Sequence, residues 1–503
     1  MRLENSARNI KTAWILHALH ILCQFASRTV IIYVLTIEYV GLSGLFSNIL
    51  TMLSLAELGI GEAITFSLYG PIARNEKKTI TEIMAFYKKV YISVGIFVLV
   101  AGFALTPFID FFIKDMPDIT DLHLIYMLYV VNSAVSYFFS YKSAFVTANQ
   151  NNYIVVLNRG LCEVLMVIFQ AVVLFTTKNY ILFMVIGIAF ILIQNISITV
   201  IADRKYPYLK EKAHSKMPDK IFQEIKKNTW AMIFHKIGTI IVFATDNLII
   251  SKFIGLISVG IYTNYCTITN AVTTFISKFF NAISASVGNL AATESAEVQE
   301  RTFFRVLFIN FWLYVFVCVC LFNLLNPFIR DIWLGEKYLF SMEIVFFIVL
   351  KLYITGLRGS VQTFKNAKGL YWYNKFMPLY ESLINLVISV VLVNYIGVCG
   401  VLIGTIISSL LTCVWIEPHV LYKYGFDKSA SRYYLRYAGY FAVFIIILAV
   451  TAFVDSFVSG TGFISFALHL MVSLTVPNLC MVLLFRKTDE FKYMTDVLKR
   501  RLK

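Results

Sequence analysis

The sequence predicts an all-α integral membrane protein with about fourteen transmembrane helices, arranged as two pseudo-symmetric six-helix lobes followed by two C-terminal helices. Three observations lead to this fold class. Of the 503 residues, 59% are hydrophobic and only 15% are charged, a composition unlike that of soluble globular proteins. Apolar windows of helical length recur along the whole chain. Finally, a short motif occurs twice, at corresponding places in the two halves.

Each apolar window is long enough for a helix to cross the hydrocarbon core, which takes about 20 residues. The run after Lys11 is too long for the apolar part of a signal peptide and ends without a small-residue cleavage site, so we interpret it as the first span. The longest gap, at 203–228, is hydrophilic and rich in lysine. The fourteen predicted spans are 12–36, 40–66, 86–109, 122–146, 153–176, 180–202, 229–254, 259–288, 303–328, 339–363, 373–395, 398–421, 434–454 and 462–485.

The basic residues alternate between the two sides of the predicted membrane. Of the 44 Lys and Arg residues, 33 fall in the N-terminus and in every second gap, whereas the other gaps hold four. Because cytoplasmic loops carry the excess of Lys and Arg, both termini are expected in the cytoplasm. The formal net charge of +15 then reflects topology and attraction to anionic membrane lipids, and it does not indicate a nucleic-acid partner.

The repeated motif divides the chain into two similar halves. GLFSN at 44–48 and GIYTN at 260–264 share Gly, an aliphatic residue, an aromatic residue, a hydroxyl and Asn. Just upstream, ASRTVIIY at 26–33 resembles ATDNLIIS at 244–251. Spans 1–6 and 7–12 would therefore share one orientation, related by an axis along the membrane normal. The expected division is an N-terminal lobe at 1–203, a basic cytoplasmic linker at 204–228, a C-terminal lobe at 229–422, and two extra spans with a basic cytoplasmic tail at 423–503.

Several kinds of site are not expected in this sequence. No GxxxxGK[ST] phosphate loop occurs, so the chain supplies no ATPase of its own. The eight cysteines lie in apolar runs without a CxxC pair, and the seven histidines lack partners at metal-ligand spacing. We therefore predict no metal site and no cofactor. A gradient-driven or facilitated transporter fits these features better than an enzyme.

One block carries a family resemblance. Residues 38–73 read EYVGLSGLFSNILTMLSLAELGIGEAITFSLYGPIA, and residues 86–91 read FYKKVY. This block resembles the N-terminal block of bacterial polysaccharide repeat-unit flippases, the Wzx-type transporters of O-antigen and capsule synthesis. They belong to the superfamily that includes multidrug and toxin extruders and the lipid II flippase. The resemblance is specific over about residues 1–110, and over the rest it extends to span number and lobe repeat.

This resemblance implies a substrate and a location. It implies that the protein moves an undecaprenyl-diphosphate-linked glycan from the inner to the outer leaflet of the bacterial cytoplasmic membrane. The polysaccharide polymerase machinery is a further candidate partner. Two other functions stay open: a multidrug extruder of the cation antiporter type, and a membrane glycan polymerase or glycosyltransferase. The first would favour an acidic cavity, and the second usually has a large polar loop that this chain lacks.

Deep ionisable side chains are the candidate functional residues, because each costs about 2.5–3.5 kcal/mol at mid-bilayer and should face protein or water. Arginine suits phosphate through its planar fork and lysine through its point charge, so deep bases predict a site for a diphosphate or an acidic sugar. These bases are Arg28, Lys278, Lys351 and Arg358. The alternative is structural salt bridging with Glu57, Asp246, Glu343 or Glu381. Arg159 precedes Glu163 by four residues, which predicts a structural pair.

The acids and glycines of the repeat blocks suggest moving parts. Arg28 is aligned with Asp246 in the repeat, so the two lobes differ in charge at matching depth. We predict that Glu57 and Asp246 serve ion coupling or gating. Gly59 and Gly61 would loosen the helix after Glu57, as a hinge does, although close packing of small residues between spans would also use glycine there.

Overall fold

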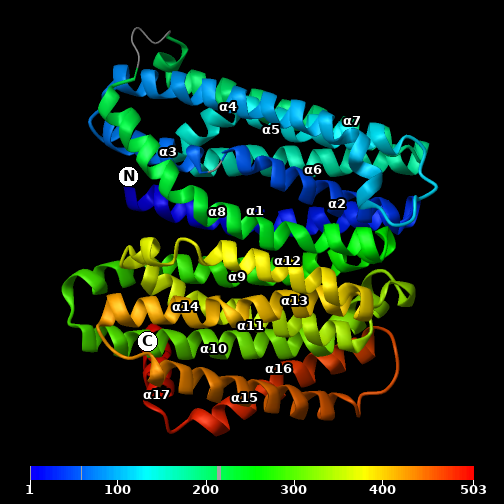
Figure 1. Cartoon of the computed structure of the whole chain (residues 1–503), viewed down its shortest axis with the longest axis vertical. Helices are drawn as coiled ribbons and strands as arrows, with labels where there is room; N and C mark the ends of the chain where they lie inside the picture. Colours follow the sequence, from blue (N-terminus) through cyan, green and yellow to red (C-terminus); the bar gives the residue numbers. More distant parts are fainter. Residues whose placement is uncertain (1, 58, 212–216, 503) are drawn as a thin grey trace. The chain divides into compact units, whose positions relative to one another are not determined.

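The computed structural model describes all residues except 1, 58, 212–216 and 503; the side chains at 2–14, 56, 228, 231–243, 281, 282, 285, 498 and 500–502 also lie outside the description. Every regular element in the described chain is helical (Figure 1). The predicted all-α fold is therefore confirmed. Long apolar helices account for it, because a backbone in hydrocarbon must satisfy its hydrogen bonds within the helix.

The first of two compact units comprises Met1–Gly260, and its long helices run alongside one another (Figure 1). Its elements are α1 (Arg2–Val34), α2 (Ile37–Leu53), the 3₁₀ helix η1 (Ser54–Glu57), α3 (Ile60–Ala73), α4 (Lys77–Leu105), η2 (Thr106–Phe112), α5 (Leu122–Ala148), α6 (Asn152–Thr177), α7 (Tyr180–Lys205), η3 (Pro207–Lys210) and α8 (Asp219–Phe253).

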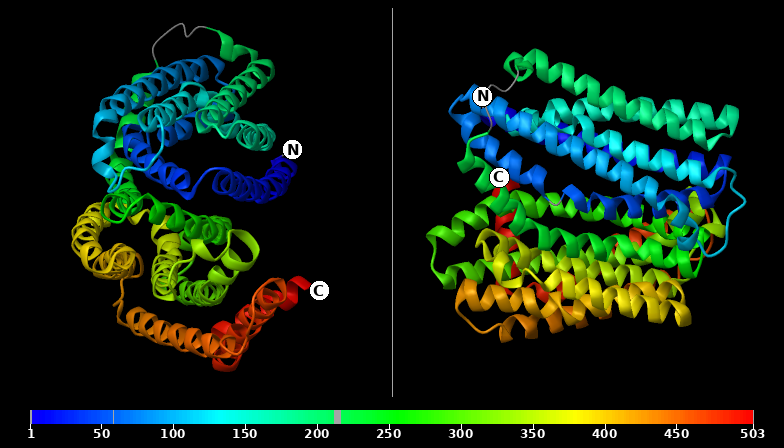
Figure 2. Two further views of the ribbon diagram at one scale, coloured as in Figure 1. Left: turned by 90° about the vertical axis from the view of Figure 1, so that its right-hand side faces the viewer. Right: turned by 45° about the horizontal axis from the view of Figure 1, so that its top comes forward.

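The second unit comprises Ile261–Lys503 and begins within α9 (Leu256–Thr293). In this unit α15 and α16 pack on α10 (Figure 2). The further elements are α10 (Ala296–Pro327), η4 (Phe328–Trp333), η5 (Glu336–Tyr338), α11 (Met342–Ala367), η6 (Leu370–Asn374), α12 (Met377–Ile396), α13 (Val398–Leu411), α14 (Cys413–Val420), η7 (Leu421–Phe426), α15 (Ser431–Asp455), α16 (Phe463–Phe485) and α17 (Asp489–Leu502).

Eleven helices in the described chain are long and apolar enough to cross a membrane. Three predicted spans are not among them. The span at 40–66 is divided, because α2 ends at Leu53 and α3 begins at Ile60. The spans at 229–254 and 259–288 each contain side chains outside the described set. The eleven are Ile15–Val34, Lys77–Phe112, Leu122–Ala148, Asn152–Thr177, Tyr180–Lys205, Ala296–Trp333, Met342–Ala367, Leu370–Ile396, Val398–Phe426, Ser431–Asp455 and Phe463–Phe485.

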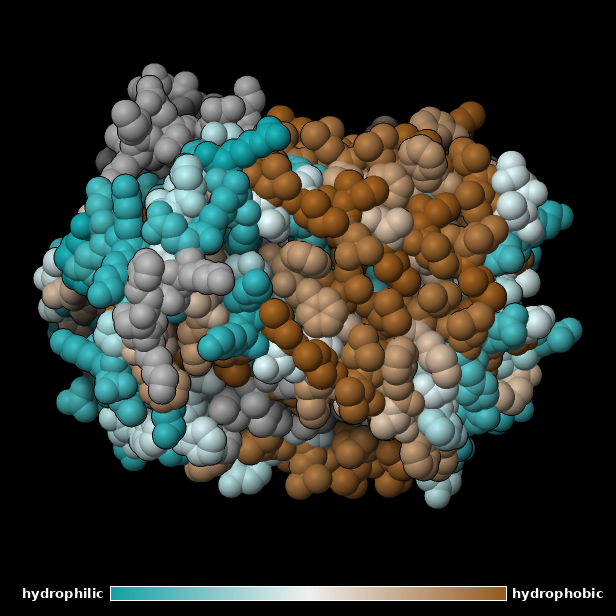
Figure 3. Space-filling model, turned by 90° about the horizontal axis from the view of Figure 1, so that it is seen from above, coloured by the Kyte–Doolittle hydropathy of each residue, from teal (hydrophilic) through white to brown (hydrophobic). Residues whose placement is uncertain are grey.

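The outer surface of the first unit fits a bilayer. Figure 3 shows a broad hydrophobic band on this face, with hydrophilic side chains gathered at both ends. Such a surface would be unstable in water but is expected where lipid tails surround the helices. The protein is therefore a multi-pass membrane protein, whereas the cytoplasmic placement of both termini stays a prediction.

Small residues set the helix spacing inside the first unit. A methyl group added at Gly95 of α4 would lie 2.5 Å from Phe138 of α5, and one at Gly102 would lie 2.5 Å from Val130. Close approach of this kind lets helices associate in lipid. There the hydrophobic effect does not drive helices together, so van der Waals packing must hold them. It holds α4 and α5 rigidly together beside the broken helix described below.

Helix α8 bears on the predicted lobe boundaries. It contacts α2 and α3 and belongs to the first compact unit, although the sequence places its start in the linker and residues 229–253 in the second lobe. Asn48 donates a hydrogen bond to the carbonyl of Ala244 at 3.2 Å, and Asn247 donates one to the carbonyl of Gly44 at 3.5 Å. Residues of the two repeated segments thus contact each other. The division at 204–228 stays a prediction.

Candidate functional site

Arg28 lies on α1 and borders a cavity of about 250 Å³ within the first unit. His20, Gln24 and Arg28 follow at four-residue spacing, so they project from one face of α1. Tyr129 of α5 and Glu163 of α6 line the same cavity. Arg28 thus borders a hollow whose wall holds polar as well as apolar side chains, and its binding role stays a prediction.

Glu163 is paired with α1 rather than with its own helix. His20 Nδ1 and Glu163 Oε1 are 2.5 Å apart, and Gln24 Nε2 lies 2.9 Å from His20 Nε2. The predicted pair of Arg159 with Glu163 is therefore wrong, because the carboxylate turns toward the imidazole. Arg159 instead lines an adjoining cavity of about 320 Å³, and Asn132 lies in the wall of the same cavity.

Asp246 is buried in α8, with 4% of its surface exposed. It lies between Ala244 and Asn247, the two residues through which α8 is hydrogen-bonded to α2. An acid at this depth is costly unless protein groups or water surround it. The position of Asp246 inside the first unit is thus compatible with a functional acid, although its predicted coupling role stays a prediction.

The second predicted span is broken where the two glycines occur. The α-helical path of α2 ends at Leu53, η1 continues to Glu57, and Gly59 adopts the left-handed φ of 77° before α3 begins. Glu57 accepts a hydrogen bond from the hydroxyl of Tyr91 on α4. The break places this carboxylate against α4 and leaves Glu62, a residue of the next turn, exposed.

Gly61 serves close packing at the same break. The hydroxyl of Tyr87 donates to the carbonyl of Gly61 at 3.2 Å. A methyl group on Gly61 would collide with the Tyr91 hydroxyl and lie 2.8 Å from Glu57 Oε1. Both predicted roles of the glycine pair thus have a structural counterpart. Gly59 permits the left-handed turn before α3, and Gly61 permits the close contact with Tyr91 of α4. Movement about this point stays a prediction.

Replacing Gly59 by alanine should destabilise the protein by about 1–2 kcal/mol, because a left-handed backbone brings Cβ close to the following carbonyl oxygen. Gly59→Asn should cost less, since asparagine tolerates this conformation better. Thermal unfolding of the purified protein in detergent measures both. Gly439→Ala is the matched control, because Gly439 lies in α15 with open space around its Cβ position. Equal stability of the Gly59→Ala and Gly439→Ala variants would contradict the strained break.

The three predicted bases of the second unit have different surroundings. Lys278 of α9 is half-buried. Lys351 of α11 donates from Nζ to the Tyr262 hydroxyl at 3.2 Å. Arg358 lies two turns further along α11 and is surrounded by carboxylates. Lys351 and Arg358 lie seven residues apart on the same helix. Their polar environments nevertheless differ.

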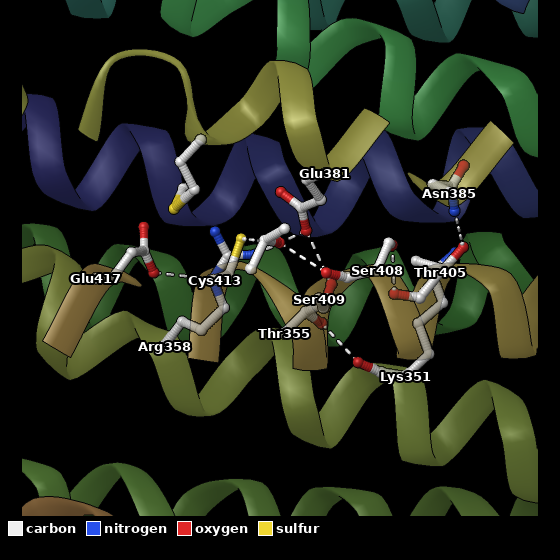
Figure 4. A network of polar contacts seen from close by, with 12 residues as sticks. Lys351, Thr355, Arg358, Glu381, Asn385, Thr405, Ser408, Ser409, Cys413 and Glu417 are labelled. Carbon is white, nitrogen blue, oxygen red and sulfur yellow. Dashed lines mark hydrogen bonds and ion pairs between the residues drawn. The ribbon is translucent and has the colours of Figure 1, made fainter. Parts of the chain in front are cut away.

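Arg358 belongs to a buried ion-pair network (Figure 4). Its Nε lies 3.0 Å from Glu417 Oε2, and its Nη1 lies 3.5 Å from Glu381 Oε1. Lys365 Nζ lies 3.0 Å from Glu417 Oε1. The Ser409 hydroxyl donates to Glu381 at 2.8 Å. Two bases and two acids from α11, α12 and α14 thus balance one another, which matches the predicted alternative of salt bridging with Glu381.

Sequence reasoning missed two members of this network. Lys365 was assigned to a cytoplasmic gap, but it lies in α11 with 1% of its surface exposed. The helix runs past the predicted span end at residue 363, and the Glu417 carboxylate compensates the charge of the buried lysine. Glu417 is a lone acid within the predicted span 398–421, and that is the signal that could have identified it.

Comparison with solved structures identifies the fold. The lipid II flippase MurJ, in an inward closed conformation, matches with a TM-score of 0.64 over 95% of this chain and 98% of that chain, at 12% identity. An inward-facing multidrug resistance MATE transporter matches with a TM-score of 0.61 over 80% and 94%, at 13% identity. The fold is that of the MOP-superfamily transporters. No protein-family model and no curated protein sequence matches the chain.

The structural similarity to MurJ extends over nearly the whole chain. A MOP-superfamily transporter from Pyrococcus furiosus also matches, with a TM-score of 0.57 over 85% of this chain and 97% of that chain, at 13% identity. All three structures are membrane transporters rather than enzymes. Within this fold, the first unit contains Arg28 beside a cavity, and the second unit contains Lys278 on α9 and Lys351 on α11.

Proposed function

We propose that this protein flips undecaprenyl-diphosphate-linked oligosaccharide repeat units from the inner to the outer leaflet of the bacterial cytoplasmic membrane by alternating access, with both termini in the cytoplasm. The observation that carries the proposal is the match to the lipid II flippase MurJ over 95% of this chain and 98% of that chain. The resemblance of residues 38–73 to repeat-unit flippases supports the same class of substrate. The product would feed cell-surface polysaccharide synthesis, with a polymerase as the next partner.

The bases proposed to bind the diphosphate are Arg28 of the first unit and Lys278 and Lys351 of the second. Arg28 is supported by the cavity that it borders, and Lys351 by its position on α11, where it donates a hydrogen bond to the Tyr262 hydroxyl. A guanidinium offers two parallel N–H groups to a phosphate, and an ammonium offers point charge. The fourth predicted base, Arg358, is held by two carboxylates, so we assign it the task of fixing α11 against α12 and α14.

Glu57 and Asp246 are the proposed acids for ion coupling or gating. Glu57 lies directly before the left-handed turn at Gly59, so a change in its charge would act on the bend. Asp246 is buried beside the hydrogen bonds that join α8 to α2. Protonation or cation binding at either acid could thus be converted into a movement of α3 or α8, with Gly59 and Gly61 as the hinge.

The proposal is tested by reconstituting the purified protein in vesicles that contain an undecaprenyl-diphosphate-linked oligosaccharide in the inner leaflet. Glycan that reaches the outer leaflet is measured with a membrane-impermeant lectin, with and without an imposed ion gradient. We expect protein-dependent exposure that is faster with a gradient, because the chain shows no nucleotide-binding motif. Exposure equal to that of protein-free vesicles would exclude the flippase.

A multidrug extruder is the second candidate, favoured by the match to a MATE transporter at a TM-score of 0.61. The same vesicles distinguish it when a fluorescent organic cation replaces the lipid-linked glycan. A flippase should leave the cation distribution unchanged. Cation transport without glycan exposure would establish the extruder instead.

A further inference from the structure

Charged side chains surround a cavity of about 720 Å³ at the end of the second unit where α10, α15 and α17 begin. This volume lies within the range of about 300–1,000 Å³ that is typical of small-molecule sites. Six basic and five acidic side chains line the cavity. The bases are Arg301, Arg305, Lys428, Arg432, Arg436 and Lys492.

The least exposed acids of the cavity are already neutralised. Lys428 Nζ lies 2.6 Å from Glu300 Oε2, and Arg436 Nη1 lies 2.5 Å from Glu490 Oε1. Burial acts to raise the pKa of Glu490, but the hydrogen bond from Arg436, a backbone hydrogen bond and the charges of Arg436 and Arg432 together lower that pKa. The other three lining acids are exposed to solvent. Four bases, of which Arg305 is half-buried, then remain beside these three acids, so the cavity keeps an excess of one positive charge.

Two arginines that line the cavity, the half-buried Arg305 and the exposed Arg432, are stacked on rings. The guanidinium of Arg305 lies 4.0 Å from the Tyr493 ring centroid, and that of Arg432 lies 5.0 Å from the Phe304 centroid. In the described part of the chain neither forms an ion pair with a carboxylate. Stacking fixes the plane of a guanidinium and leaves N–H groups at its edge to donate.

The Phe304 ring has two positively charged arginines close to it. Arg436 also lies over Phe304, at 4.4 Å, so two guanidinium groups share one aromatic side chain. Their mutual repulsion is partly offset by Glu490, which pairs with Arg436. An anion between Arg432 and Arg305 would relieve the remaining repulsion and would accept hydrogen bonds from both.

We propose that this cavity binds a phosphate group, held by Arg301, Arg305, Arg432 and Lys492. Arg432 is the second residue of the apolar span Ser431–Asp455, so the cavity lies at the depth where lipid headgroups meet the helices. The phosphate can come from a phospholipid headgroup or from free phosphate, because both present the same oxygens. This site is independent of the transport proposal and does not depend on the orientation in the membrane.

Binding would also fix the C-terminal helix. Tyr493 of α17 stacks beneath Arg305, and Phe491 stacks on Trp312 of α10 with ring centroids 5.6 Å apart. A phosphate bridging Arg305 and Lys492 would join α10 to α17. Ligand binding should therefore protect the backbone amides of α17 from hydrogen exchange, a readout separate from transport.

The test compares two double variants of the full-length protein. Arg305→Gln with Arg432→Gln removes the stacked arginines. Arg486→Gln with Lys487→Gln removes the same charge from two exposed residues that do not line the cavity. Inorganic phosphate is titrated in detergent at constant ionic strength by calorimetry. In parallel, vesicles of phosphatidylcholine with and without phosphatidylglycerol supply the lipid, and bound phosphatidylglycerol is measured by mass spectrometry.

We expect the cavity variant to bind at least about tenfold more weakly than the wild type, and the control variant to bind like the wild type. Binding of inorganic phosphate identifies free phosphate as a ligand, whereas retention of phosphatidylglycerol alone identifies the lipid. Arg305→Lys with Arg432→Lys keeps the charge and should restore part of the affinity, which excludes misfolding as the cause. Equal losses in the cavity and control variants, or binding of neither probe by the wild type, would overturn the proposal.

Discussion

Glycan export should be lost when Arg28 is replaced by alanine, while the amount of protein in the membrane stays unchanged. Arg28 borders a cavity of the first unit, and the proposed substrate carries a diphosphate that its guanidinium would hold. A hydrogen bond to a charged group contributes about 1.5–3 kcal/mol, so two lost bonds reduce binding by a hundredfold or more, as an order of magnitude. Surface polymer is measured in cells that depend on this protein, beside its level in isolated membranes.

Two further substitutions separate binding from a structural role of Arg28. Arg28→Lys should keep partial export, because charge survives and the bidentate fork does not. Arg204→Ala is the matched control at an exposed site and should leave export intact. If Arg28 were only a structural partner of Asp246, the variant Arg28→Gln with Asp246→Asn would export at nearly the wild-type rate. That outcome would refute the phosphate-binding role.

Glu417→Gln is expected to cost about 3–5 kcal/mol of stability, because breaking a buried ion pair leaves an uncompensated charge. Glu417 exposes 2% of its side chain and pairs with both Arg358 and Lys365. After the substitution, Arg358 keeps its contact with Glu381, whereas Lys365 loses its carboxylate partner. The melting temperature in detergent and the yield of folded protein measure the effect.

A double variant tests whether charge balance is the cause. Lys365→Met with Glu417→Gln removes one base and one acid and leaves Arg358 paired with Glu381. Stability should therefore return toward the wild-type value, in line with the tolerance of buried pairs for apolar replacement. Glu336→Gln removes one exposed acid of the same unit and should change little. A double variant less stable than Glu417→Gln would show that packing, and not charge, controls the network.

Hydropathy predicted the elements well because a spanning helix leaves a signal in every residue of its length. The break in the second predicted span was not predicted, because the apolar run is continuous over 40–66, although Gly59 and Gly61 were singled out there as a possible hinge. Ion-pair partners were harder to predict. Glu163 bonds to His20, 143 residues away, although Arg159 lies one turn from it. Local spacing shows which side chains can meet on one helix, but the packing of different helices decides which polar groups are closest.

The ion-pair network also constrains how the protein is made. Arg358 precedes Glu417 by 59 residues, so α11 leaves the ribosome well before α14. At about 5–20 residues per second, this separation corresponds to a delay of roughly 3–12 seconds. During that time Arg358 and Lys365 cannot reach Glu417, the acid that pairs with both. The second unit must therefore reach its native state late in synthesis, with α11 kept near water or the insertion machinery until α14 arrives.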